Sequence, residues 1–468
     1  MKVNSSTPVL AVLVGLLYIL IMTPLMGRKM GYTLDATPSF QVTRAIVETG
    51  DLFPDISVKQ GYLYSVVYIP FYLMGKAAAM FLPAFTEDWV ERKFMCWMNT
   101  VITGATLGMM VLTGTALGFR KRTGVIMALL YGFSTLAFPY ARYDYNKVLA
   151  GFLLLLVFYF YIQSVQQRQW KFVLLSGISL ALLVMVRLEM VIAAVPIGMG
   201  IYGIQQDMRG KVKQSLYLLG PLAAGVLFVI LYNFFYWQGE IAGGYEEGEE
   251  GFQLNPFNAL AGFVLSPGKS MFLFNPILLL FPFALRPFSY RVGSLFKVWA
   301  GTLLSIFLLY CFWGNWWGGW GWGARHLVPL LPLVVLSLAA LWEETETQVR
   351  GVLVFLGIAG FLVQLLGSFV DFNDVLLTLF NAGAGDGIPA AVMEYRIIWN
   401  PLLSQLLHHS LFFFNLPVSR WDFLFVAAGE QMPLPFVLLL SLLWLSAASG
   451  LGYAVMKKSE LQAELQAE

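Results

Sequence analysis

Twelve apolar runs, most of them long enough to cross a lipid bilayer as a helix, dominate this sequence of 468 residues. A spanning helix needs about 20 apolar residues, and within lipid every backbone polar group must find its partner inside the protein. Charged residues make up 12% of the chain, against about 25% in soluble proteins. We therefore predict an all-α, polytopic integral membrane protein with about 12 (11–13) transmembrane helices. The predicted spans are residues 8–27, 94–118, 123–140, 148–163, 172–187, 189–205, 216–236, 270–286, 298–314, 327–342, 351–371 and 433–456.

The basic residues between these runs predict the orientation of the chain, because short cytoplasmic loops are enriched in Lys and Arg. Residues 61–84 are also apolar, but basic loops alternate correctly with a cytoplasmic N-terminus only if this stretch crosses the membrane zero or two times. We predict that 28–93 forms one outer segment with interfacial helices. The alternative, thirteen spans, would place Arg120–Arg122 outside. The loops predicted to be cytoplasmic are 120–122, 166–171, 205–213, 286–291 and 457–458.

Several functional classes find no support in the sequence. It has no long basic run, which argues against nucleic-acid binding, and no CxxC, HExxH or Gly-rich phosphate loop. Its two cysteines, Cys96 and Cys311, lie in or near apolar runs, far apart in sequence; free thiols are the prediction and a disulfide is the alternative. The unusual polar residues collect instead in the loops that the topology places outside.

The first outer segment carries a carboxylate, Asp35, directly before a predicted short helix with Thr37 as N-cap, Pro38 at its first position and Gly50 after its end. A carboxylate near a helix N-terminus stays ionised and can take a proton from a hydroxyl group. Asp35 is therefore a candidate catalytic base. The alternative is an ordinary surface or capping acid.

Two further polar motifs stand at the outer ends of predicted spans. "YDYNK" contains Tyr143, Asp144 and Lys147, which are candidates for substrate binding or belong to an interfacial aromatic belt. "VRLEM" interrupts an apolar stretch with Arg187 and Glu189. Because ionisable groups at membrane depth are costly, these two either line the mouth of a cavity or form a structural ion pair.

A Ser-Pro-Gly turn at 266–268 precedes Lys269 at a predicted helix start. Backbone N–H groups beside a cation suit a phosphate, although a snorkelling lysine is the alternative.

"WGNWWGGWGWGARH" combines glycines, which permit close backbone approach, with tryptophans, which stack on sugars or polyprenyl chains. Trp317, Trp320 and His326 are candidate substrate-binding residues here, and Arg325 can hold a phosphate bidentately. An interfacial belt is the alternative reading.

These motifs, in this order, resemble the GT-C glycosyltransferases, which use polyprenyl-phosphate sugars and include protein O-mannosyltransferases and aminoarabinose transferases. The resemblance covers most of residues 1–345 and implies Asp35 as catalytic base. It also implies donor-phosphate binding by Arg325, Lys269 and Arg187, and it adds Tyr245, in the loop before "SPGKS", as a substrate contact. Bacterial relatives often show an Asp-Glu pair at the base, whereas Ala36 follows Asp35 here.

The resemblance implies a GT-C catalytic module at 1–345, followed by C-terminal transmembrane helices at 346–468 with an outer loop at 372–432, which either binds the acceptor or caps the cavity. The expected activity is inverting transfer of a sugar from a polyprenyl-phosphate donor to a hydroxyl of a glycan, lipid or protein acceptor. We expect a prokaryotic inner membrane protein with an outward-facing site and no cofactor. A metal-dependent variant would need Asp35, Asp144 and other carboxylates to converge. A transporter or flippase, or a non-catalytic assembly subunit, remains an alternative.

Overall fold

The computed structural model describes residues 6–28, 36–56, 58, 60–82, 85–204, 207–236, 251–344, 347–426 and 434–464. Within these ranges every regular element is a helix, apart from one isolated β-bridge between Phe252 and Trp313. The all-α prediction is thus confirmed. The elements are α1 (Ser6–Met22), η1 (Thr23–Leu25), α2 (Thr37–Thr49), α3 (Tyr62–Ala79), α4 (Glu87–Ala116), α5 (Lys121–Ser134), α6 (Ala137–Tyr140), α7 (Lys147–Gln167), α8 (Trp170–Val186), η3 (Leu188–Ala193), α9 (Ala194–Ile204), α10 (Met208–Tyr236), α11 (Phe257–Leu265), α12 (Met271–Phe274), η4 (Pro276–Leu280), α13 (Phe281–Val292), α14 (Leu295–Cys311), η5 (Arg325–Leu330), α15 (Leu331–Glu344), α16 (Thr347–Phe369), α17 (Phe372–Gly385), α18 (Ala390–Trp399), η6 (Pro401–Leu403), α19 (Gln405–Asn415), η7 (Val418–Arg420) and α21 (Leu434–Glu464).

Each of the twelve predicted spans coincides with one helix or with a short succession of helices. Six stretches of helix in the described chain are long and apolar enough to cross a membrane: Ser6–Leu25, α4, α7, α10, Arg325–Glu344 and α16. Shorter apolar helices occur at Trp170–Val186, Leu188–Gly203 and Leu295–Cys311. Helix α3, which covers the ambiguous stretch 61–84, is not among these candidate spans and packs against α2 and α4.

Helix α4 lies at the centre of the bundle, packed against α1, α3, α5 and α7. Glycines allow its closest approach to α1: a Cβ atom on Gly15 would lie 2.7 Å from the carbonyl oxygen of Gly104. Small residues at helix crossings are typical of membrane bundles, where close backbone packing replaces the hydrophobic effect as the driving force.

The start of α2 differs from the prediction by one residue. Thr37 is the first residue of the helix, and the N-cap is Ala36, which has no side chain able to cap. Pro38 falls in the first turn, where its missing N–H costs nothing. Gly50 ends the helix with φ +72°, a left-handed conformation that favours glycine, so the predicted end is confirmed.

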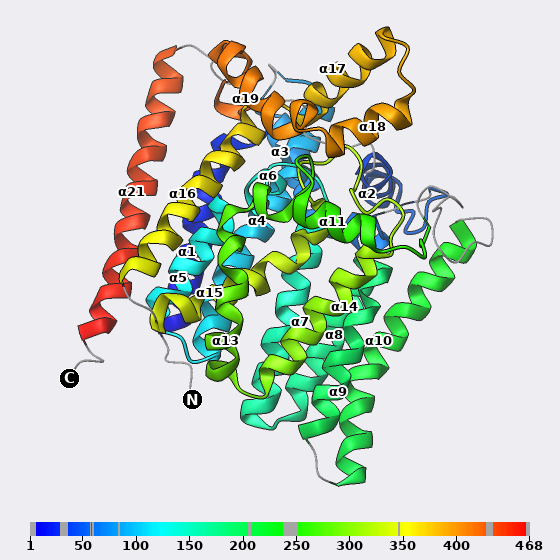
Figure 1. Ribbon diagram of the computed structural model, residues 1–468, viewed down its shortest axis with the longest axis vertical. Coiled ribbons are helices and arrows are strands. Elements are labelled where there is room, and N and C mark those ends of the chain that lie inside the picture. The colour runs from blue at the N-terminus through cyan, green and yellow to red at the C-terminus, as the bar shows by residue number, and fades with distance from the viewer. Residues whose placement is uncertain are drawn as a thin grey trace.

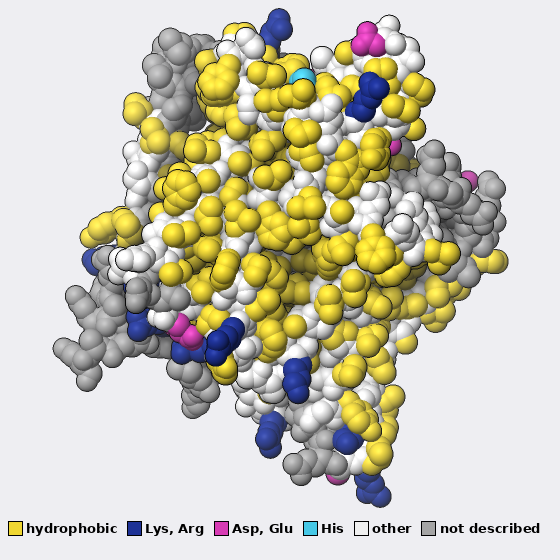
Figure 2. All heavy atoms as spheres, viewed as in Figure 1, with side chains coloured by type: hydrophobic (Ala, Val, Ile, Leu, Met, Phe, Trp, Pro, Cys, Tyr) yellow, Lys and Arg dark blue, Asp and Glu magenta, His cyan; other side chains and the backbone are white. Residues whose placement is uncertain are grey.

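The two ends of the bundle hold different elements (Figure 1). Helices α2, α3, α6, α11, α17, α18 and α19 lie at the upper end, and the last turns of α21 lie near the lower end. Lys and Arg side chains gather along the lower edge of the face in Figure 2, below a broad apolar surface. Helices α6 and α11, each of which precedes a polar motif discussed below, lie in this upper half.

Candidate active site

The first part of the site is the loop between α6 and α7. Buried polar side chains of α4 donate hydrogen bonds to the backbone of this loop. Asn99 Nδ2 donates to the carbonyl oxygens of Tyr143 (2.6 Å) and Tyr145 (2.9 Å). Thr100 Oγ1 donates to the carbonyl of Ala141 (2.7 Å). Because α4 is the central helix, this loop is fixed relative to the whole bundle.

Asn146 brings two cations together. Its Oδ1 accepts hydrogen bonds from Lys147 Nζ (3.3 Å) and from Arg187 Nη1 (3.1 Å). Its Nδ2 donates to the carbonyl oxygens of Gln60 (3.0 Å) and Val186 (3.3 Å), which sets the orientation of the amide. Asn146 was not among the predicted site residues. The one feature of the sequence that could have indicated it is its place between a tyrosine and a lysine in the YDYNK motif.

Arg187 and Glu189 form an ion pair that also meets the Trp-Gly segment. Glu189 Oε1 accepts from Arg187 Nη2 and from the hydroxyl of Tyr310 (3.1 Å). The ring of Tyr310 stacks on His326, with centroids 5.0 Å apart, and lies 6.0 Å from the Arg187 guanidinium carbon. His326 Nε2 lies 3.1 Å from the carbonyl oxygen of Asn315. Thus α14 supplies Tyr310 as the link between two motifs more than a hundred residues apart.

Arg325 is the first residue of η5, and its guanidinium carbon lies 5.5 Å from the centroid of the Tyr145 ring. Two glycines make room for it. A Cβ atom on Gly318, whose φ is +75°, would lie 2.7 Å from Arg325 Cγ, and one on Gly321 would lie 2.7 Å from Arg325 Cδ. The glycines of the segment therefore let its backbone fold closely around the arginine.

We define the cation cluster as Asn146, Lys147, Arg187, Glu189, Tyr310, Arg325 and His326. Lys147, Arg187 and Arg325 each lie close enough to His326 to interact with it electrostatically. Three cations face one carboxylate in this set, so its net charge is positive. Guanidinium and ammonium groups in a partly desolvated site are suited to bind a phosphate.

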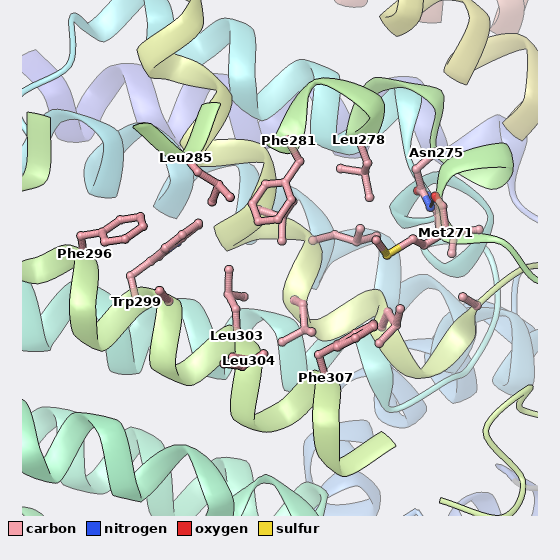
Figure 3. A pocket seen from close by; sticks show the side chains of 17 residues that line it. Met271, Asn275, Leu278, Phe281, Leu285, Phe296, Trp299, Leu303, Leu304 and Phe307 are labelled. Atoms are coloured by element: carbon pink, nitrogen blue, oxygen red, sulfur yellow. Dashed lines mark hydrogen bonds between the residues drawn. The ribbon is translucent and has the colours of Figure 1, made fainter. Parts of the chain in front are cut away.

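An apolar cavity of about 370 Å³ opens between the η4–α13 segment, α14 and the η5–α15 segment. Its wall includes Ala324 and Leu327, which flank Arg325 and His326 in sequence. In Figure 3, Phe281 and Leu285 face Leu303, Leu304 and Phe307 across this space. Among the described residues of the wall, Asn275 has the one amide side chain, and its Oδ1 accepts a hydrogen bond from the backbone N–H of Leu136 (2.8 Å). The cavity is thus suited to a hydrocarbon chain.

Comparison with known proteins gives a likeness in structure only. No family model matches the sequence, and no curated protein matches it. The crystal structure of ArnT from Cupriavidus metallidurans bound to undecaprenyl phosphate superposes with a TM-score of 0.53 at 10% sequence identity, over 90% of this chain and 76% of that one. The apo structure of the same protein gives a TM-score of 0.48 at 11% identity, with the same coverage of both chains.

The chain shares the fold of the ArnT structure bound to undecaprenyl phosphate. The helical membrane fold that the resemblance implied is thereby confirmed. At 10% identity the likeness assigns no residue a role, so the remaining predicted site residues are described by their own contacts.

Lys269 is buried in the turn between α11 and α12. Its Nζ donates to the carbonyl oxygens of Gly319 (3.0 Å) and Gly321 (2.6 Å). Burial and the nearby Arg325 lower the pKa of Lys269 well below its usual value. These contacts attach Lys269 to the segment that carries Arg325.

The two predicted tryptophans point to different neighbours. The Trp317 ring lies 5.8 Å from Lys269 Nζ, next to the cation cluster. The Trp320 ring stacks almost parallel on Phe380 of α17, with centroids 5.1 Å apart. Trp322, which the prediction passed over, is fully buried and donates through Nε1 to Gln364 Oε1 (3.2 Å).

Tyr143 and Asp144 belong to the same loop as Asn146 but face other partners. The hydroxyl of Tyr143 donates to Asp422 Oδ2. Asp144 is buried and interacts electrostatically with Tyr64 and Tyr68 of α3.

The predicted residues Asp35 and Tyr245 lie outside the described ranges. Within those ranges, no three His, Cys, Asp or Glu side chains gather as potential metal ligands.

Proposed function

We propose that the protein is an inverting glycosyltransferase that moves a sugar from a polyprenyl-phosphate donor to an acceptor hydroxyl. The observation that carries this proposal is an apolar cavity whose wall includes Ala324 and Leu327, the sequence neighbours of Arg325 and His326 in the cation cluster. A polyprenyl phosphate has the same two parts, an anionic head and a hydrocarbon tail. The similar fold of an ArnT structure that contains undecaprenyl phosphate supports the proposal.

The chemistry needs few groups. In this reaction the acceptor oxygen attacks the anomeric carbon, and the bond from that carbon to the phosphate oxygen breaks on the opposite face. A phosphate leaves as a stable anion, so cations can stabilise it without the general acid that a glycosidase needs for its leaving alkoxide. We propose that Arg325, Arg187 and Lys147 hold the phosphate and that Asp35 takes the proton of the acceptor hydroxyl.

The remaining predicted residues have supporting roles in this proposal. Lys269 reaches the donor site through the Gly319 and Gly321 carbonyls, and Trp317 and His326 form walls near the sugar. We propose no metal cofactor, because the cation cluster supplies the positive charge that the leaving phosphate needs.

The orientation follows from the charges. Lys and Arg side chains along the lower edge in Figure 2 favour a cytoplasmic lower end. The cation cluster then serves the outer leaflet of a prokaryotic inner membrane, where a glycan, lipid or protein can present its hydroxyl group.

The decisive experiment measures transfer from a panel of radiolabelled polyprenyl-phosphate sugars by the purified protein in lipid nanodiscs. The parent is compared with Asp35→Asn and with the control Asp386→Asn, which changes an exposed carboxylate at the end of α17. Loss of a general base typically costs about 10²–10⁴-fold, so we expect Asp35→Asn to be slower by that factor and the control to match the parent.

Equal rates for Asp35→Asn and the parent would remove Asp35 as the base. A parent that transfers none of the sugars yet binds polyprenyl phosphate would favour a lipid transporter or an assembly subunit over the enzyme.

A further inference from the structure

The chain segment that follows α1 is held at four consecutive residues, Leu25–Arg28, by bonds from other parts of the molecule. A backbone carbonyl or N–H group is engaged at each position. The four bonds are Arg142 Nε to Leu25 O (2.5 Å), Leu424 N to Met26 O (2.7 Å), Lys93 Nζ to Gly27 O (2.5 Å) and Arg28 N to Asp422 Oδ1 (2.7 Å).

Asp422 joins this segment to two others. Its Oδ1 accepts from the backbone of Arg28, while its Oδ2 accepts from the Tyr143 hydroxyl and lies 3.4 Å from Arg142 Nη2. Its own backbone N–H donates to the carbonyl of Phe369 at the end of α16 (2.8 Å). Asp422, Arg142 and Tyr143 are all buried, so water cannot readily replace the hydrogen-bond partners of the carboxylate.

Both segments are close in sequence to residues of the proposed site. Arg28, the last residue of the Leu25–Arg28 segment, precedes Asp35, the proposed base, by seven positions in the sequence. Tyr143 lies two residues before Tyr145, whose ring lies beneath the Arg325 guanidinium, and four before Lys147 of the cation cluster. A single carboxylate from the C-terminal part of the chain therefore ties the segment that leads to the base to the loop that binds the donor.

We propose that Asp422 is a positioning residue. By binding both the Leu25–Arg28 segment and the loop between α6 and α7, it sets the position of the proposed base relative to the residues that bind the donor. The inference rests on the proposed function. It gives the predicted outer loop at 372–432, whose role was open between acceptor binding and capping of the cavity, a part in the reaction. It also assigns Tyr143 a role that depends on Asp422 and not on contact with the substrate.

The chemistry of the side chain makes Asp422→Asn a sharp test. Both oxygens of the carboxylate accept hydrogen bonds, whereas an asparagine amide has one acceptor and one donor group. Because Tyr143 and Arg142 both donate, the amide oxygen will turn to them and the NH₂ group will face the Arg28 N–H. The variant keeps its size and loses the bond to the first segment.

The first measurement is hydrogen exchange of the full-length protein in nanodiscs, which does not depend on catalysis. We expect the amides of Leu25–Arg28 to exchange at least about tenfold faster in Asp422→Asn than in the parent. The loss of one hydrogen bond lowers the free energy of opening this segment by about 1.4 kcal/mol, which corresponds to an open population about tenfold larger. Asp386→Asn is the matched control and should exchange like the parent. Unchanged exchange in Asp422→Asn would overturn the proposed clamp.

The second measurement is a double-mutant cycle on transfer with Asp422→Asn and Tyr143→Phe. A misplacement of 1 Å can cost about 10²-fold in rate, so we expect kcat to fall by that order while the donor Kd changes less than about threefold. If Tyr143 acts through Asp422, the double variant will be no slower than Asp422→Asn alone. Additive losses would show that Tyr143 contacts the substrate and would overturn the assignment.

The two measurements separate this inference from the function on which it rests. An inactive parent whose Leu25–Arg28 exchange still depends on Asp422 would mean that the proposed reaction is wrong and the clamp is real. An active parent with an equally active Asp422→Asn would mean the reverse.

Discussion

Arg325 shows how a single side chain is prepared for an anion. The backbone of the Trp-Gly segment folds so closely around it that a Cβ atom on Gly318 or Gly321 would collide with its methylene groups. Its guanidinium is placed over the Tyr145 ring, 5.5 Å from the centroid. An arginine held in this way has little rotamer freedom left to lose when a ligand binds, which favours affinity.

We expect Arg325→Lys to bind polyprenyl phosphate about tenfold more weakly than the parent. The substitution keeps the charge but removes the fork of N–H donors, and one charge-assisted hydrogen bond contributes about 1.5 kcal/mol. Equilibrium binding of a fluorescent polyprenyl phosphate in nanodiscs measures the change. Arg286→Lys, an exposed arginine of α13, is the control. Equal affinity in Arg325→Lys would place the phosphate elsewhere.

At this scale the sequence pointed to charged residues and to aromatic motifs, and it missed the neutral side chains that join them. Arg187 and Glu189 were recognisable because charges interrupt an apolar stretch. Asn146 and Tyr310 were not, because an amide or a phenol at the end of a span is common and gains meaning only from its partners. The carboxylate of Asp422 offered no signal either, since the side chains it joins lie 279 and 280 residues away in the chain.

Helix α19 is attached to the bundle through a buried histidine. His409 Nδ1 lies 3.3 Å from the carbonyl oxygen of Leu366 in α16, and its ring meets the Trp322 ring edge-on at 4.5 Å. Burial lowers the pKa of His409 to about 3. The folded state therefore contains the neutral ring at every pH at which the protein is normally studied.

We expect the unfolding temperature to fall as the pH is lowered from 7 to 5, and to fall less in His409→Gln. A histidine with a pKa lowered in the folded state stabilises the fold above its unfolded pKa of about 6.5, and this contribution is lost on acidification because the unfolded chain binds the proton. At pH 5 the loss amounts to about 2 kcal/mol. Thermal unfolding at both pH values, with His408→Gln as control, measures it; identical pH dependence in His409→Gln and the parent would contradict the assignment.

The elements themselves were largely predictable. Every predicted span has its helix, because a run of about 20 apolar residues leaves the backbone no other way to satisfy its polar groups in lipid. The ends of elements were less certain. Thr37 was expected to cap α2 and is instead its first residue, while the N-cap Ala36 makes no side-chain hydrogen bond to the exposed N–H groups.

The arrangement of the whole molecule places the apolar cavity against α14, which supplies Ala300, Leu303, Leu304 and Phe307 to its wall. The next turn of the same helix carries Leu308, which is 42% exposed and does not line the cavity. Helix α14 thus offers two neighbouring positions that differ in what they face.

We expect Ala300→Phe to weaken donor binding by at least about tenfold, since the added ring takes up space that a hydrocarbon tail would fill and each buried CH₂ contributes about 0.8 kcal/mol. Leu308→Phe should leave binding unchanged. Competition between donors with long and short tails provides the readout: a soluble short-tailed donor should be affected much less by Ala300→Phe. Equal binding of the long-tailed donor by both variants would place the tail outside this cavity.

The dimensions of the cavity set a limit on what the protein can distinguish in its donor. At about 370 Å³ the space lies near the lower end of the range for pockets that enclose a drug-sized molecule. A polyprenyl chain of many isoprene units does not fit inside, so under the proposed function only the units next to the phosphate are enclosed and the rest extends among the bilayer lipids. Such an enzyme cannot select its donor by the full length of the polyprenyl chain. It should accept any polyprenol that exceeds a minimum length, and its choice among donors then rests on the sugar.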